Sequence, residues 1–506
     1  MRITNFRILS VLFIFSAFSG CSKYNSFEKI TIPAQDLQIP VIQLALDPSQ
    51  PGPPIAEDFI GLGYEKTMLR LPDIFTPENT VLTQLLSNLG KGNLRMGANG
   101  ADLAKWSRLP RTDTTGNDVV TADDLDRFYS FVRGTGWNVV HALNLRSSRP
   151  EIGADEAEYT AKIASGTLVA FEIGNEPDLK MRNRYRVTDY IREFREFTSA
   201  VKEKVPDAKF VGPGATYFPG QYFWSLSRGV DEWSVPFSNE VGKEIVQLTH
   251  HIYVLGQKYA TIPEEKYLAT IPNLLGSEAR DLYIPTLKKL AAASKSIGVP
   301  YRINESNSCY HGGMDNVSNV FASALWTVDY LFTLATYGAS GVNFHGGTQF
   351  YAPVETRPEG QSLARPMYYG LLMFHTCSRG SLVPVKKIND TQLEVSTYVT
   401  LATDGSAAIA IINREAETDV NIEFDATRFF TKGKVLRLEG PSLNAKTGVK
   451  FGGAAVSPDG KWVPESNETI TRDGRLFKIH IPAGSAAAIL LEKDPIDPVL
   501  SKRPGR

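Results

Sequence analysis

The stretch Leu168-Val-Ala-Phe-Glu-Ile-Gly-Asn-Glu-Pro177 decides the fold of this chain. It begins as an apolar run of strand length and ends in the polar group Asn175-Glu176-Pro177. A short, nearly continuous apolar run is typical of a strand that is buried on both faces of a parallel sheet. In such folds the functional residues gather at the carboxyl ends of the strands. Glu176 is therefore a candidate functional residue.

Seven further strand candidates lie on either side of this stretch and alternate with helical patterns. With Leu168–Gly174, the set is Phe59–Glu65, Asn93–Gly97, Asn138–Leu145, Lys209–Gly214, Gln247–Val254, Tyr301–Glu305 and Gly341–His345. Eight strand–helix units within about 290 residues predict an α/β fold, the (β/α)8 TIM barrel. The rival is an open doubly wound sheet, which usually carries a glycine-rich phosphate loop after its first strand. Gly61-Leu-Gly63 alone does not make such a loop.

The pattern changes to strict alternation after Pro366. Alternating strands at Leu393–Leu401 and Ala408–Ile412 flank the turn pair Asp404-Gly405. This predicts a C-terminal antiparallel β-sandwich over residues 366–494. The segment Lys29–Leu46 is also strand-like but has no local partner, so we expect it to complete the distant sandwich.

The first residues read as a targeting segment. Arg2 and Arg7 precede the apolar run Ile8–Phe18, which is too short to span a bilayer as a helix. The residues that follow, ending at Cys21, resemble the lipobox of bacterial lipoproteins. The resemblance implies cleavage before Cys21, lipid attachment to its sulfur, and export to the periplasm or cell surface on the outer membrane. The alternative is an ordinary signal peptide with an incidental cysteine.

The predicted organisation therefore has five parts. They are a lipoprotein signal peptide at 1–21, a tether and N-terminal strand at 22–56, a catalytic barrel at 57–352, a sandwich at 366–494 and a tail at 495–506.

Composition excludes several function classes. The 506 residues include 54 Lys and Arg against 55 Asp and Glu, a net charge of −1, which argues against a nucleic-acid binder. Three cysteines and seven scattered histidines do not suggest a zinc framework. We expect no metal and no cofactor, and we infer no obligate protein partner.

A second glutamate, Glu305, ends the seventh predicted strand, as Glu176 ends the fourth. Barrel closure would bring both carboxyl groups to one rim. Two carboxyl groups about 5–5.5 Å apart are the arrangement of a retaining glycosidase, with one acid and one nucleophile. The charge of Glu305 would raise the pKa of Glu176. Arg95 either lies beneath the pair and keeps Glu305 ionised or forms a peripheral salt bridge.

The motifs FEIGNEPD at 171–178 and NES…YHGG at 304–313 resemble glycoside hydrolase family 79, the β-glucuronidase and heparanase family of clan A. The resemblance covers nearly the whole mature chain and implies the barrel with its sandwich. It implies that Glu176 is the acid/base and Glu305 the nucleophile. It also implies that Asn175 bonds the sugar 2-hydroxyl.

The same resemblance implies a set of substrate-binding residues. Tyr310 and the Gly312 amide fall where the family holds the sugar carboxylate, and Tyr351 resembles the tyrosine of strand eight. Tyr253 resembles the strand-six tyrosine near the nucleophile. Glu65, at the end of the first strand, is expected to bond outer hydroxyls.

The sequence thus predicts a lipid-anchored retaining exo-β-glucuronidase acting on terminal β-linked glucuronic acid, including its 4-O-methylated form. Its expected partners are this carbohydrate and the membrane that carries its anchor. Three alternatives stay open. They are an endo-acting heparanase-like hydrolase, a xyloside or arabinofuranoside specificity in the same clan, and a non-catalytic glycan-binding lipoprotein.

Overall fold

The computed structural model describes residues 39–47, 50–112, 114–179, 185–217, 229–257, 265–389, 391–426 and 430–493. Cys21 and the predicted signal peptide, most of the tether and the C-terminal tail lie outside these residues. Residues 39–506 cluster as one compact unit. Among the described residues, no helix combines the length and the apolar character needed to cross a membrane.

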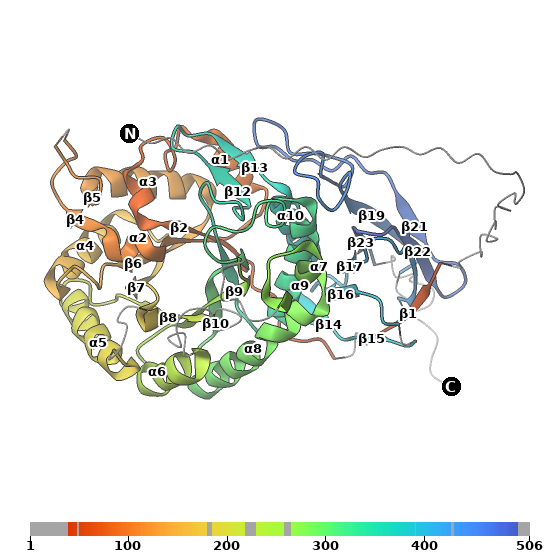
Figure 1. Ribbon diagram of the computed structural model, residues 1–506, viewed down its shortest axis with the longest axis horizontal. Coiled ribbons are helices and arrows are strands. Elements are labelled where there is room, and N and C mark those ends of the chain that lie inside the picture. The colour runs from red at the N-terminus through yellow and green to blue at the C-terminus, as the bar shows by residue number, and fades with distance from the viewer. Residues whose placement is uncertain are drawn as a thin grey trace, which may run out of the picture. The chain divides into compact units, whose positions relative to one another are not determined.

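Eight parallel strands close into a barrel, which confirms the predicted (β/α)8 fold (Figure 1). Each predicted strand forms, with ends that differ by a few residues. In barrel order they are β2 Ile60–Glu65, β3 Asn93–Gly97, β6 Asn138–Leu143, β7 Leu168–Ile173, β8 Phe210–Tyr217, β9 Gln247–Leu255, β10 Tyr301–Cys309 and β11 Val342–His345. The seam closes where β11 pairs with β2.

Helices surround the barrel because their apolar faces pack on the outer side of the strands. Figure 1 shows α3 to α6 and α8 following the outside of the ring. The α-helices are α1 Thr80–Ser87, α2 Ala98–Leu103, α3 Ala122–Thr135, α4 Pro150–Ile163, α5 Val187–Lys204, α6 Val235–Val241, α7 Ile271–Leu275, α8 Ser277–Ile297, α9 Phe321–Thr336 and α10 Pro366–Cys377. Shorter turns are η1 Lys66–Arg70, η2 Pro177–Leu179, η3 Val230–Ser234 and η4 Glu265–Tyr267. Two small sheets pair β4 Lys105–Ser107 with β5 Val119–Thr121 and β12 Val354–Thr356 with β13 Ser362–Ala364.

The C-terminal strands form two sheets that share one apolar core. The seven-stranded sheet holds β14 Ser381–Val383, β16 Val395–Leu401, β17 Ala407–Asn413, β19 Lys432–Glu439, β20 Lys450–Phe451, β21 Thr469–Thr471 and β23 Ser485–Leu491. The four-stranded sheet holds β1 Val41–Leu46, β15 Val385–Lys387, β18 Val420–Asp425 and β22 Phe477–Ile481. The early strand β1 pairs with β15 and β18, so it completes the sandwich as expected.

One segment within the predicted sandwich range has a different structure. Residues from Pro366 to Cys377 form helix α10, and the sandwich strands begin at Ser381. Tyr368 and Phe374 of α10 lie in the apolar core of the barrel, and the Phe374 ring packs on Phe332 of α9. The strands predicted from the alternation after residue 393 do form, but residues 366–377 are a helix that packs on the barrel side of the boundary.

Candidate active site

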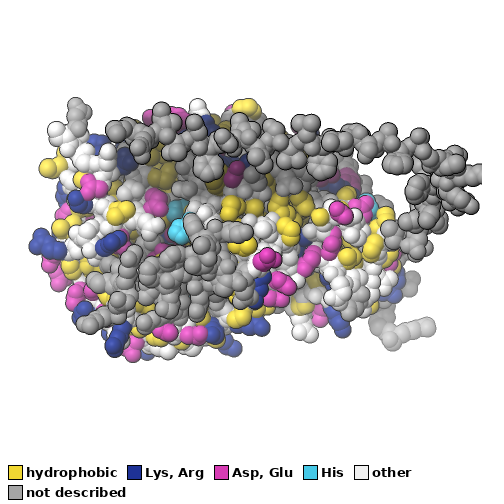
Figure 2. Space-filling model, in the orientation of Figure 1, with side chains coloured by type: hydrophobic (Ala, Val, Ile, Leu, Met, Phe, Trp, Pro, Cys, Tyr) yellow, Lys and Arg dark blue, Asp and Glu magenta, His cyan; other side chains and the backbone are white. Residues whose placement is uncertain are grey.

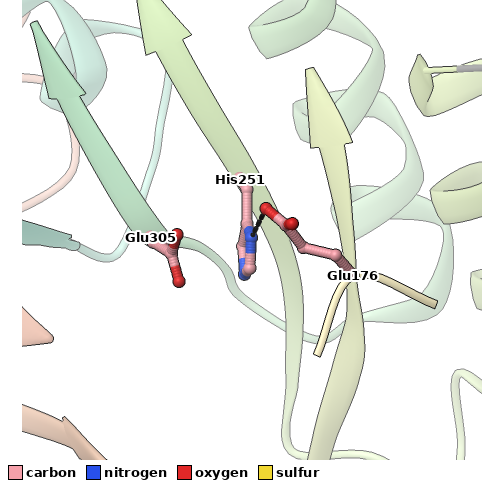
Figure 3. A group of neighbouring side chains, drawn as sticks. All are labelled: Glu176, His251 and Glu305. Atoms are coloured by element: carbon pink, nitrogen blue, oxygen red, sulfur yellow. Dashed lines mark hydrogen bonds and ion pairs between the residues drawn. The ribbon is translucent and has the colours of Figure 1, made fainter. Parts of the chain in front are cut away.

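Glu176 and Glu305 meet at one end of the barrel. One oxygen of each carboxyl group and one ring nitrogen of His251 lie within 4.8 Å of one another. Figure 3 shows the His251 ring between the two carboxylates, with its Nδ1 atom bonded to Glu176. Barrel closure therefore joins two acids that are far apart in the sequence, in a geometry that suits proton transfer and nucleophilic attack.

Irregular backbone aims these side chains into the barrel. The register of β10 against β9 shifts between Ile303 and Glu305. Such a bulge re-aims side chains and is common beside active sites. Glu176 has a φ of 44°, in the left-handed region that non-glycine residues rarely occupy. Strain of this kind persists only where surrounding structure holds it, and it clusters at functional sites.

Glu305 is buried among hydrogen-bond donors. Arg95 Nη1 donates to its Oε2 over 2.6 Å, and the Tyr253 hydroxyl donates to its Oε1 over 2.8 Å. Burial alone would raise the pKa of Glu305, but His251, His345 and Arg95 hold it well below its usual range. Burial lowers the pKa of His251 to about 4, so that ring is neutral at neutral pH, whereas the pKa of His345 is raised above its ordinary value. Glu305 is thus an anion, as a nucleophile requires.

Glu176, in contrast to Glu305, favours its protonated form. Burial and then the negative charge of Glu305 raise its pKa well above the usual range. The sequence predicted the repulsion, but burial contributes more. The His251 ring nitrogen lies 3.0 Å from Glu176 Oε1 and holds that edge of the carboxyl group. A protonated carboxyl beside an ionised one is the pairing expected of an acid and a nucleophile.

Arg95 lies beneath the carboxyl pair rather than at the periphery. Its Nε donates to Glu172 Oε2 over 2.7 Å and its Nη2 donates to Asn175 Oδ1 over 2.9 Å. One guanidinium therefore fixes the predicted nucleophile, the predicted 2-hydroxyl ligand and a third carboxylate. Sequence reasoning missed Glu172, although it stands in the same FEIGNEP stretch.

Three predicted tyrosines share one buried cluster. Tyr253, Tyr310 and Tyr351 pack together, and the ring centroids of Tyr253 and Tyr351 are 6.1 Å apart. Gly312 lies nearby in the loop after β10, with a φ of 87°. A Cβ at Gly312 would lie 2.5 Å from Gln349 Oε1, the end of a side chain that can move aside, so it is the backbone conformation that favours glycine here.

Glu65 lies at the mouth of the site but has partners within the protein. It accepts a hydrogen bond from the Gly100 amide, and its Oε1 lies 3.7 Å from His345 Nε2. The Glu65 side chain is 31% exposed, so it is accessible to substrate hydroxyls. Sequence reasoning also missed His345, which lies at the end of β11 where a functional strand end was expected.

His250 and Cys309, on the strands that carry His251 and Glu305, have structural roles. His250 is buried and its Nδ1 pairs with the Ser234 hydroxyl over 2.9 Å. Cys309 is fully buried, and burial raises the pKa of its thiol to about 12, so it is unreactive. Donor atoms of Glu176, His251 and Glu305 are close enough to share a metal ion. Because both oxygens of Glu305 already accept hydrogen bonds, from Arg95 and Tyr253, we assign no metal to them.

The chain resembles known glycosidases in sequence. No protein-family model matches it. A β-glucuronidase from Aspergillus niger is 23% identical over 87% of this chain and 91% of its own length. A β-glucuronidase from Neurospora crassa is 24% identical over 66% of this chain and 65% of its own length.

Solved structures share the fold. A 4-O-α-L-rhamnosyl-β-D-glucuronidase from Fusarium oxysporum superposes with a TM-score of 0.72 at 15% identity, covering 89% of this chain and 99% of that one. A family 51 arabinofuranosidase from Xanthomonas axonopodis pv. citri gives a TM-score of 0.65 at 15% identity, covering 90% and 100%. The chain is thus related in sequence and in fold to glycosidases.

Proposed function

We propose that the protein is a retaining exo-β-glucuronidase that hydrolyses terminal β-linked glucuronic acid from glycans or glycoconjugates. The observation that carries the proposal is the facing pair Glu176 and Glu305, whose pKa values are shifted in opposite directions, upward for Glu176 and downward for Glu305. One oxygen of each lies within 4.8 Å of the other, near the separation of about 5–5.5 Å typical of retaining enzymes. Inverting enzymes place the two groups farther apart to admit a water molecule.

The reaction proceeds by double displacement. Glu305 attacks the anomeric carbon while Glu176 gives its proton to the leaving oxygen, so a glycosyl ester forms and the alcohol departs. Glu176, now ionised, then takes a proton from water as the water attacks the same carbon. The ester bond breaks, glucuronic acid leaves, and both glutamates return to their starting states. Arg95 holds Asn175 through its Oδ1 atom, which leaves the amide nitrogen of Asn175 to donate to the sugar 2-hydroxyl.

The sugar is proposed from the tyrosine cluster and the relatives. Tyr310, together with the Gly312 amide, would hold the sugar carboxylate with neutral donors. Tyr351 lies in the same cluster and Gly312 follows on the same loop as Tyr310. The relatives named β-glucuronidases and the glucuronidase with the same fold support this choice over other sugars.

Two other specificities deserve a direct test. The arabinofuranosidases with the same fold favour an arabinofuranoside or xyloside alternative. An endo-acting heparanase-like enzyme would need basic side chains gathered along a cleft. On the face in Figure 2, basic and acidic side chains are interspersed among the described atoms, which does not support that alternative.

A panel of nitrophenyl glycosides tests the proposal. We expect hydrolysis of the β-glucuronide and, more slowly or not at all, of the β-glucoside, β-xyloside and α-arabinofuranoside. NMR of the first product should show the β-anomer, because two displacements retain configuration. Faster arabinofuranoside or xyloside cleavage would reject the sugar assignment, and an α-product would reject the mechanism. A 4-O-methylated glucuronide added to the panel tests tolerance at that position.

We also propose that the chain is exported and lipid-anchored through Cys21, with the outer membrane as its site. The supporting pattern is the basic and apolar run that ends at this cysteine. Labelling of bacterial cells with a fatty-acid probe should mark the wild-type protein but not the Cys21→Ala variant. Equal labelling of both would reject the anchor.

A further inference from the structure

His345 lies between two carboxylates at the end of β11. Its Nδ1 is 3.4 Å from Glu305 Oε1, and its Nε2 is 3.7 Å from Glu65 Oε1. Asn307 Nδ2 donates to the His345 carbonyl over 3.0 Å, which fixes the backbone that carries the ring. The side chain is 8% exposed. One imidazole therefore bridges the predicted nucleophile and a second acid.

The charges around this ring favour its protonated form. Glu305 on β10, Glu65 on β2 and Arg95 on β3 face it, and the hydroxyl of Tyr253 on β9 lies 3.4 Å from Nδ1. The Tyr351 ring lies 5.7 Å away between centroids. Arg95 is shared with Glu172, so it cannot balance every carboxylate in the pocket. In the described part of the chain, His345 is the one basic side chain within 4 Å of Glu65.

The titration of His345 agrees with this arrangement. Burial alone would lower its pKa, but the charges of Glu305 and Glu65 raise it above the ordinary value for histidine. His251, on the acid/base side, behaves in the opposite way, since its pKa falls to about 4. The pKa values of the two histidines in the pocket are thus shifted in opposite directions.

We propose that His345 is a positively charged positioning residue that holds the Oε1 edge of Glu305, and that Glu65 keeps it charged. The inference rests on the proposed function, in which Glu305 is the nucleophile. Arg95 holds Oε2 of Glu305, so two cations and the Tyr253 hydroxyl fix both oxygens of the carboxylate. Glu65 acts on the reaction through His345.

NMR of protein labelled in its histidine rings tests the charge directly, without any assay of activity. The signal absent from the His345→Gln variant identifies His345. We expect its midpoint in the wild type to lie above 6.5, the ordinary value for histidine. In Glu65→Gln the midpoint should move to lower pH, because one of the two carboxylates has lost its charge. A wild-type ring that is neutral at pH 6 would overturn the proposal.

Kinetics test the action on Glu305. In His345→Gln the acid limb of kcat/KM for nitrophenyl β-glucuronide should move upward by about one pH unit, because one cation beside Glu305 is lost. Glu65→Gln should add little to His345→Gln, since its effect passes through the histidine. His480→Gln is the matched control, because His480 pairs with Asp419 over 3.2 Å on the exposed face of the sandwich.

The outcomes separate the two proposals. A wild type that is inactive on every glucuronide rejects the proposed function, whereas the NMR midpoints still test the charge of His345. An active wild type whose acid limb stays in place in His345→Gln overturns the positioning role. If that variant does not fold, an unmoved His345 midpoint in Glu65→Gln overturns it instead.

Discussion

At the scale of single residues, the proposed roles of Glu176 as the acid and Glu305 as the nucleophile predict how each variant fails. Glu176→Ala should lower kcat/KM by roughly 10²–10⁴-fold for substrates with poor leaving groups and much less for activated nitrophenyl glucuronides. The reason is that an activated leaving group departs without a proton. Glu305→Ala should abolish hydrolysis of both classes. A series of aryl glucuronides with graded leaving groups measures the difference.

Glu244→Ala is the control for this pair, because Glu244 forms an exposed ion pair with Arg195 on the outside of the barrel. It should retain wild-type rates. Equal loss on good and poor leaving groups in Glu176→Ala would argue against its role as the acid, and residual turnover by Glu305→Ala at the wild-type rate would reject the nucleophile.

The pH dependence of kcat/KM should follow the same two groups. Glu305 must be ionised and its pKa is lowered, so activity should fall only in strong acid. Glu176 must be protonated and its pKa is raised, so activity should fall as the pH rises through that raised value. Burial also raises the pKa of Asp178, which follows Glu176 closely, to about 7. If the Asp178→Asn variant no longer lost activity at alkaline pH, the alkaline limb would have to be assigned to Asp178 and not to Glu176.

Tyr310→Phe separates recognition of the sugar from chemistry. Loss of a hydrogen bond to a charged group costs about 1.5–3 kcal/mol, so the glucuronide-to-glucoside ratio of kcat/KM should fall on the order of 10-fold or more. Tyr337→Phe, near the far end of α9, should leave the ratio unchanged. A parallel loss on both sugars in Tyr310→Phe would indicate a packing role in the tyrosine cluster.

The residues show which parts of the site a sequence can reveal. Glu176 and Glu305 stand at strand ends beside recognisable motifs, so their meeting follows once the barrel is predicted. Glu172 lies inside the FEIGNEPD motif but before the strand end, and His345 lies in no motif. Their roles depend on the partners that closure brings, Arg95 for the first and Glu65 with Glu305 for the second. For the same reason, the sequence did not decide whether Arg95 lies beneath the carboxyl pair or forms a peripheral salt bridge.

At the scale of elements, the barrel seam between β11 and β2 depends on a glycine. Gly61 pairs with Asn343, and a Cβ there would lie 2.5 Å from Asn343 Nδ2 and 2.7 Å from Arg302 Nη2. Gly61→Ala should therefore destabilise the fold by about 1–3 kcal/mol through overpacking. Thermal unfolding measures the effect.

Gly134→Ala is the matched control for the seam. Gly134 lies in α3, and nothing stands within 4 Å of its added Cβ. This change should stabilise the protein slightly, by up to about 1 kcal/mol, because alanine favours the helix. If Gly61→Ala were as stable as Gly134→Ala, the seam would have to relax more easily than its contacts indicate.

Elements also show where pattern reading succeeds and fails. Barrel strands such as β7 and β9 contain apolar runs, and all eight were predicted because short, largely apolar segments alternate with helical patterns. Helix α10 was not predicted, since its apolar residues cover the whole helix and leave no amphipathic period. Packing on α9 and the barrel core decides its structure.

At the scale of the whole molecule, the barrel and the sandwich are joined by a buried ionic contact. Arg414, just after β17, lies 3.2 Å from Asp329 of α9, and the Tyr398 hydroxyl of β16 donates to Asp329 over 2.8 Å. The Tyr398 ring stacks on Phe332 of α9, with 4.8 Å between centroids. Since both sides share this contact and cluster as one compact unit, we expect them to unfold in a single transition.

Removal of the Asp329 carboxylate tests that contact. Asp329→Ala should lower the free energy of unfolding by about 1–3 kcal/mol, because Arg414 loses one buried partner and keeps the other, Glu394 at 3.0 Å. Burial alone would raise the pKa of Asp329, but Arg414 and Arg280 lower it. The pair therefore stabilises the fold above the ordinary aspartate pKa and loses its effect as the pH falls through the lowered value. Urea unfolding should accordingly show a large difference between wild type and variant at pH 7 that shrinks in acid.

Lys289→Ala, which breaks the exposed pair of Lys289 with Asp231, should change stability little at either pH. Two separate transitions in the wild type would mean that the contact does not couple the barrel to the sandwich.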